Sequence, residues 1–168
     1  IASGSSGNCI YVGSDNTHVL VDIGISGKKM ETGLNSLELT GRDLDGILIT
    51  HEHSDHIKGL GVISRKYGIP IYATAGTVDA MVRTNALGKI PEGIFHEIQE
   101  DEPFMINDLK VNPFTIPHDA AQPVGYRLEH EGHSVGIATD LGKYNDYIIE
   151  NLQGLDALLL EANHDIRM

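Results

Sequence analysis

Residues 50–59 read T-H-E-H-S-D-H-I-K-G and place three histidines and two carboxylates in six consecutive positions. These five residues are His51, Glu52, His53, Asp55 and His56. A solvated charged face would favour Lys, Arg and Glu over His, and a core histidine would stand alone among apolar neighbours. Imidazole and carboxylate groups are common ligands of divalent transition metals. The stretch therefore predicts a metal site.

The ligands in this stretch divide between two ions. Side chains alternate along an extended loop, so His51 and His53 point to the same side and can meet one ion. Asp55 and His56 lie where the next helix begins, and because adjacent side chains diverge we assign them to a second ion. Two imidazoles leave the first ion short of a third protein ligand.

Two later residues follow apolar segments and carry ligand side chains. His118 follows F-T-I-P, and Asp140 follows V-G-I-A-T. We expect His118 to complete the first ion's ligands, and Asp140 to bridge both ions because a carboxylate has two oxygens. The second ion then has only three protein ligands, so one is missing.

Composition and length limit the class of protein. A chain of 168 residues with 40% hydrophobic and 21% charged content predicts one globular domain over residues 1–168. No apolar run is long enough to cross a bilayer and no export leader is evident, so we expect a cytoplasmic protein without a membrane partner. The single cysteine, Cys9, excludes an intrachain disulfide. The sequence does not indicate an oligomeric state.

The formal charge of −12 argues against a broad basic surface for nucleic acid. Two bound divalent ions would nevertheless make the site itself locally positive. Lys28 and Lys29 stand where they would steer an anionic substrate, but a solvated helix start is the interpretation we favour.

Hydrophobic patterns predict an α+β fold with two sheets in a sandwich covered by helices. The first half has predicted strands at Cys9–Val12, His18–Asp22, Ile47–Ile49 and Ile71–Ala73, and predicted helices at Lys28–Leu39, Ile57–Tyr67 and Thr77–Leu87, the last with Thr77 as its N-cap. The second half has two predicted hairpins, Phe104–Ile106 with Leu109–Thr115 and Val124–His130 with His133–Thr139, then a helix at Lys143–Leu152 and a strand at Ala157–Ala162. Because Met168 follows that strand by a few residues, we expect the domain to be incomplete at its C-terminus.

The pattern His51-x-His53-x-Asp55-His56 after an apolar strand, followed by His118 and Asp140, resembles the signature of the metallo-β-lactamase superfamily. That resemblance implies a four-layer αββα sandwich with a two-metal site at the sheet edges. It also implies a further histidine ligand in a C-terminal portion that this sequence does not reach. The segments A-S-G-S-S-G-N-C at 2–9 and L-E-A-N-H-D at 160–165 resemble the YycJ/WalJ-like branch, on the nuclease and phosphodiesterase side of the superfamily. The β-lactamases use a cysteine where Asp140 stands and the diiron redox members a glutamate where His53 stands, so both are disfavoured.

The resemblance and the ligand set together predict a dinuclear metal-dependent hydrolase that uses a metal-bridging hydroxide as its nucleophile. We expect a phosphodiesterase or nuclease, exonuclease-like, with DNA or RNA as substrate. A shell of His and Asp without thiolate suits Zn, Mn or Fe. Two alternatives stay open: a small-molecule hydrolase of a thioester, lactone or cyclic phosphate, which the acidic charge favours, and a non-catalytic metal-binding fragment.

Further residues are candidates for supporting roles. Asp55 is expected to orient the hydroxide as well as bind metal. His164 is expected to contact substrate phosphate or protonate the leaving group, the alternative being a surface loop histidine. Asp22 is a candidate partner for a ligand imidazole, or else a turn-forming residue before Gly24. The predicted phosphate contacts on the glycine-rich opening loop are Ser5, Ser6 and Asn8.

Overall fold

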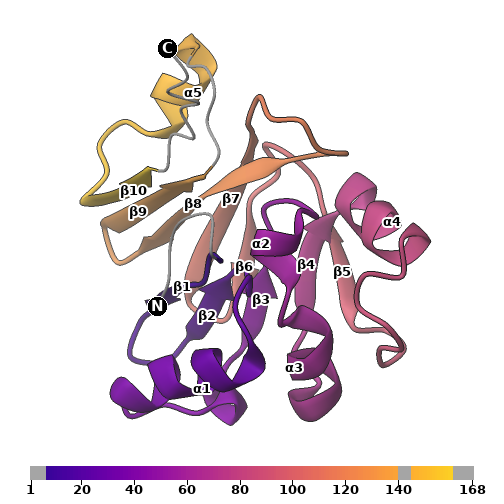
Figure 1. Cartoon of the computed structure of the whole chain (residues 1–168). Coiled ribbons are helices and arrows are strands. Elements are labelled where there is room, and N and C mark those ends of the chain that lie inside the picture. The colour runs from indigo at the N-terminus through magenta and orange to yellow at the C-terminus, as the bar shows by residue number, and fades with distance from the viewer. Residues whose placement is uncertain (1–6, 140–144, 161–168) are drawn as a thin grey trace, which may run out of the picture.

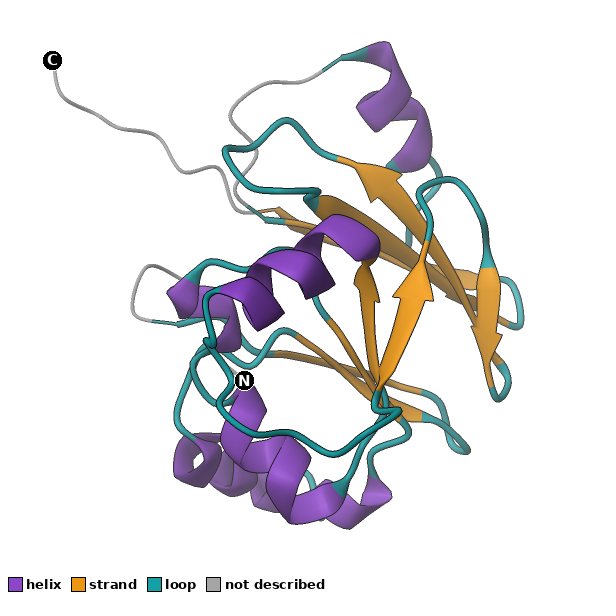
Figure 2. Cartoon of the chain, turned by 90° about the vertical axis from the view of Figure 1, so that its right-hand side faces the viewer, coloured by secondary structure: helices purple, strands orange, loops and turns teal. Residues whose placement is uncertain are grey.

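Two five-stranded sheets face each other in this computed structural model, which describes residues 7–139 and 145–160. Helices cover the outer face of each sheet, so the layers run helix, sheet, sheet, helix (Figure 1, Figure 2). The predicted αββα sandwich is confirmed. No helix in the described ranges is both long and apolar enough to cross a bilayer.

The first sheet has the order β1-β2-β3-β4-β5, with β1 and β2 antiparallel and every later pair parallel. Its strands are β1 (Ile10–Gly13), β2 (His18–Val21), β3 (Gly46–Leu48), β4 (Ile71–Thr74) and β5 (Phe95–Ile98). β3 is buried along its whole length, as its continuous apolar run predicted. Its carboxyl end therefore delivers residues 50–56 to one edge of the sheet.

The helices of the first half pack on the outer face of this sheet. They are α1 (Gly27–Ser36), the 3-10 turn η1 (Gly41–Asp43), α2 (Ser54–Ile57), α3 (Leu60–Tyr67) and α4 (Ala75–Arg83). The single helix predicted at residues 57–67 is wrong in its bounds. The Gly59 amide donates to the Ile23 carbonyl at 2.8 Å instead of continuing the helix, and this separates α2 from α3.

The N-cap predicted for α4 is also wrong. Thr74, at the end of β4, accepts the Thr77 amide through its side chain and caps the helix three residues earlier than expected. Thr77 itself is buried in the first turn.

The second sheet has the order β10-β9-β8-β7-β6, antiparallel except for the parallel pair of β9 and β10. Its elements are β6 (Phe104–Ile106), β7 (Leu109–Thr115), β8 (Val124–His130), β9 (His133–Ala138), α5 (Asp146–Asn151) and β10 (Ala157–Leu160). Both predicted hairpins are confirmed.

The core between the sheets is built from both of them. Val21 and Leu48 from the first sheet pack with Val111, Leu128 and Ile137 from the second. Tyr126 joins the layers near the edge that carries the histidines, because its buried hydroxyl donates to the Ile49 carbonyl at 2.6 Å. Burial raises the pKa of the Tyr126 phenol well above its usual value, so this hydrogen stays available to the carbonyl.

At the end of the sandwich away from residues 51–56, a polar cluster around Asp108 joins turns of the two sheets. Its carboxylate accepts hydrogen bonds from the hydroxyls of Thr17 and Ser14 and lies 2.9 Å from the Nε2 of His130. The hydrogen bond from Thr17, followed by that from Ser14 and the charge of His130, lowers the pKa of Asp108 to about 2 despite some desolvation. Turns from both sheets therefore meet at this carboxylate.

Candidate metal centre

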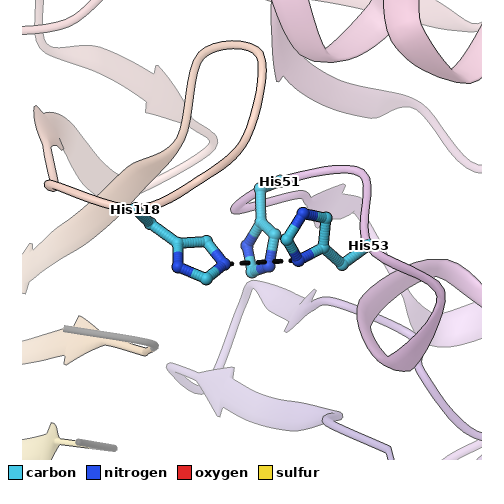
Figure 3. Close-up of side chains that lie close together, drawn as sticks. All are labelled: His51, His53 and His118. Atoms are coloured by element: carbon cyan, nitrogen blue, oxygen red, sulfur yellow. Dashed lines mark hydrogen bonds between the residues drawn. The ribbon is translucent and has the colours of Figure 1, made fainter. Parts of the chain in front are cut away.

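Three imidazoles converge at the edge where the two sheets meet. His51 and His53 come from the loop after β3, and His118 comes from the β7–β8 loop of the other sheet (Figure 3). One ligand atom from each lies within 4.8 Å of the other two. The Nε2 of His118 is 3.3 Å from the Nδ1 of His53. The structure thus brings together the three residues that the sequence assigned to the first ion.

This spacing fits a metal site. Tetrahedral zinc binds histidine nitrogen at about 2.0–2.1 Å, which places two ligand nitrogens roughly 3.3–3.4 Å apart. The distance between the His118 and His53 nitrogens has this value. His51 is fully buried and the other two histidines are partly buried, so an ion held here would be shielded on the protein side and open on the other.

Asp22 holds Thr50 and His56 in place through hydrogen bonds. It is fully buried at the end of β2, with a φ of 64° that few side chains other than Asn and Asp tolerate. Its carboxylate accepts the Thr50 amide at 2.8 Å, the Thr50 hydroxyl at 2.7 Å and the Nδ1 of His56 at 2.6 Å. The contact between Asp22 and an imidazole of the motif, expected from the sequence, is present in the structure. Its role toward a metal stays a prediction.

These hydrogen bonds fix which ring nitrogens carry hydrogen. A carboxylate only accepts, so the Nδ1 of His56 donates. The Asn8 amide nitrogen, which only donates, faces Nε2 at 3.2 Å, so Nε2 keeps the lone pair. The Thr50 hydroxyl gives its single hydrogen to Asp22, and so it accepts from the Nδ1 of His51 at 3.0 Å. The Nε2 atoms of both histidines are therefore the ones suited to bind a cation.

Asp55 and His56 lie side by side, as expected for ligands of one ion. The Oδ2 of Asp55 is 3.5 Å from the Nε2 of His56, and the Asp55 side chain is 31% exposed. Asn8, predicted to contact substrate, is 1% exposed and places its Nδ2 3.2 Å from the same His56 nitrogen. A substrate contact by Asn8 stays a prediction.

Gly24 allows the loops of this site to approach one another. A Cβ on Gly24 would lie 1.6 Å from the Asp55 carbonyl oxygen. That oxygen accepts the Asn8 amide at 2.8 Å, while the Gly24 amide donates to the Asn8 carbonyl at 2.7 Å. The opening loop, the loop after β2 and α2 are thereby held in contact.

Glu52 is a site residue for which the sequence suggested no separate role. Its Oε1 accepts the Ala121 amide at 2.8 Å. Gln122 adds a second anchor to this loop, since its Oε1 accepts the Gly76 amide of α4 at 2.8 Å. The loop that carries His118 is therefore attached both to the histidine motif and to a neighbouring helix. Side-chain alternation was the available signal, because it puts Glu52 opposite His51 and His53.

Four predicted site residues lie outside the described residues and stay predictions. They are Ser5, Ser6, Asp140 and His164.

Comparison with known proteins agrees with the geometry. A family model described as "Beta-lactamase superfamily domain" matches residues 17–167, so the chain belongs to the metallo-β-lactamase superfamily, as its motif predicted. Within that superfamily the chain is 41% identical over 168 residues to Exodeoxyribonuclease YycJ of Bacillus anthracis, and 40% identical over 168 residues to Exodeoxyribonuclease WalJ of Streptococcus pneumoniae. The predicted resemblance to the YycJ/WalJ-like branch is confirmed.

The similarity covers the whole of this chain but only part of the length of each relative. Both relatives are matched over 100% of this chain, which spans 63% of the length of the first and 62% of the second. Among solved structures, Zn(2+)-bound PqqB from Methylobacterium extorquens superposes with a TM-score of 0.75 at 18% identity, covering 94% of this chain and 62% of PqqB. At that identity the superposition supports the fold alone.

Proposed function

We propose that the chain is the metal-binding part of a divalent-metal-dependent nuclease that hydrolyses phosphodiester bonds in DNA, in an exonuclease-like manner. RNA is the second substrate of the same chemistry. The observation that carries the proposal is the convergence of His51, His53 and His118 from two sheets onto one point. Two relatives about 40% identical over the whole chain bear the name exodeoxyribonuclease, which favours DNA.

The proposed ligand set divides between two ions. His51, His53 and His118 would hold the first, Asp55 and His56 would hold the second, and Asp140 would be shared between them. Zn, Mn and Fe all suit such a shell of imidazole and carboxylate. When bound, such a pair of ions would lower the pKa of a shared water to yield a hydroxide nucleophile, and would stabilise negative charge on the phosphate.

The protein's own residues are proposed to supply orientation and proton transfer. Asp22 keeps the Nδ1 of His56 protonated and Thr50 does the same for His51, so each presents a lone pair on Nε2. Asp55 is partly exposed and is proposed to orient the attacking water. His164 is proposed to donate a proton to the leaving oxygen. Residues 1–168 are proposed to belong to a single domain.

The test combines metal analysis with hydrolysis assays on the full-length protein. We expect bound divalent metal and release of nucleotides from DNA oligonucleotides. His53→Ala should lose metal and activity while keeping its fold, whereas His133→Ala, which removes an exposed histidine on β9, should match wild type. A protein that holds two ions, leaves DNA and RNA intact and opens a thioester, lactone or cyclic phosphate would contradict the proposal.

A further inference from the structure

The positive charge of this acidic chain is unevenly placed. Residues 28–66, which contain the histidine motif, hold six of the twelve Lys and Arg residues and six of the 24 Asp and Glu residues. The segment is therefore neutral, and the whole formal charge of −12 lies elsewhere. A nucleic acid approaching this segment would therefore meet less repulsion than the formal charge of the whole chain implies.

Three lysines of this segment gather at one place. The Gly59 amide donates to the Ile23 carbonyl at 2.8 Å, and a Cβ on Gly59 would lie 3.4 Å from the Gly27 nitrogen. The start of α1 thus touches the turn between α2 and α3. Lys28 and Lys29 follow Gly27 and Lys58 precedes Gly59, so their backbones lie on adjoining segments. We call Lys28, Lys29 and Lys58 the basic rim.

α1 and α3 run in the same direction, and Glu31 of α1 forms an ion pair with α3. Gly27 lies against Ile63 at the start of α3, whereas Glu31 pairs with Lys66 near its end, at 2.5 Å. The ion-pair partner of Glu31 is therefore Lys66 and not a rim lysine. Throughout the described ranges, the rim lysines are exposed and form no ion pair.

The rim adjoins the candidate metal centre. Lys58 has helical φ and ψ values of −51° and −42°, so it lies one turn beyond Asp55 on the same face of α2. Asp55 directs its carboxylate toward the Nε2 of His56. On the other side, Gly24 packs against the Asp55 carbonyl a few residues before Lys28.

We propose that the basic rim binds the phosphate backbone of a DNA strand beside the phosphodiester that is cleaved. The proposal rests on the proposed nuclease function and adds the direction from which the strand reaches the site. Lys is suited to this role because it contacts phosphate without reading bases. The rim therefore contributes affinity that depends on salt and not on sequence.

The test compares two substrates in the metal-loaded, full-length protein. One is a single-stranded oligodeoxynucleotide, and the other is bis(p-nitrophenyl) phosphate, which has no flanking phosphates. The rim variant carries Lys28→Gln, Lys29→Gln and Lys58→Gln. The matched control carries Arg42→Gln, Lys89→Gln and Lys110→Gln, three exposed residues away from the rim, and so removes the same charge.

Each phosphate contact on a single strand contributes a salt exponent of about 0.7. If two or more rim contacts are lost, kcat/KM at about 0.1 M salt should fall at least about 25-fold more on the oligonucleotide than on the small diester. The oligonucleotide activity of the rim variant should also fall less steeply with salt, by at least about 1.4 in the exponent. The control should follow wild type. If wild type cleaves the oligonucleotide and the rim variant matches the control, the phosphate-binding role of the rim is refuted and the nuclease function stands. If wild type leaves the oligodeoxynucleotide intact, the role of the rim toward DNA is refuted, and if it leaves RNA intact as well, the nuclease function is refuted too.

Discussion

Asp22→Asn changes one buried atom and tests how the candidate metal centre is held in place. Asn tolerates the φ of 64° at this position, so the backbone is not strained by the change. The Thr50 amide, 2.8 Å from Oδ1, keeps an acceptor. The Oδ2 atom, which receives the hydrogen of His56 at 2.6 Å, becomes an NH₂ group that cannot accept it.

We expect His56 to respond by exchanging its tautomer. Its Nδ1 would accept from the new amide, and its hydrogen would move to Nε2, the atom proposed to face the second ion. Restoring the productive tautomer costs about 1.5–3 kcal/mol, the usual contribution of a hydrogen bond to a charged group. Affinity for the second ion should therefore fall about 10- to 100-fold. The first ion should be weakened as well, because the Thr50 hydroxyl that faces His51 loses its acceptor at the same Oδ2 atom.

Calorimetric titration of the metal-free, full-length protein with Zn²⁺ or Mn²⁺ measures both affinities. Asp45→Asn is the matched control, because its carboxylate also accepts a backbone amide, that of His18 at 2.8 Å, at the far end of β2. The control should bind both ions as wild type does. Wild-type affinity for both ions in Asp22→Asn would refute the role assigned to Asp22.

Three further predictions concern the loops and the far end of the sandwich. Glu52→Ala removes the acceptor of the Ala121 amide and should weaken metal binding about tenfold or more, whereas Glu52→Gln keeps an acceptor and should restore it; equal binding in all three proteins would contradict this. Asp108 has a pKa of about 2, below the ordinary value near 3.9, so it stabilises the fold fully above about pH 4 and loses this effect toward pH 2. Asp108→Asn should then lower the melting temperature at pH 6 and flatten its decline between pH 4 and 2. Gly24→Ala would place a Cβ 1.6 Å from the Asp55 oxygen and should destabilise the protein by about 1–3 kcal/mol or more, seen by denaturant titration.

The sequence predicted the layers and the histidine cluster because both depend on local pattern. β3 is a short apolar run followed at once by H-x-H-x-D-H, and alternation in an extended loop was enough to pair His51 with His53. His118 was assigned from its position after a strand, and the structure places it beside His53. Periodicity and ligand chemistry together sufficed for this part of the site.

What the sequence did not predict depends on contacts between distant segments. β5 reads F-H-E-I, with two exposed polar residues, and its strand character comes from pairing with β4. The break between α2 and α3 arises from a hydrogen bond to Ile23, which no local pattern reports. The contact of Glu52 with Ala121 spans 69 positions and depends on how the second sheet folds over the first.

The convergence of His53 and His118 has a consequence for folding as well as for chemistry. They are 65 positions apart and belong to different layers, so an ion held by both would act as a reversible cross-link across the sandwich. At a free ion concentration 100 times its dissociation constant, the folded state gains about 2.7 kcal/mol. Metal-starved protein would lose this gain and unfold more often. The lifetime of the protein against proteolysis would then follow the supply of metal.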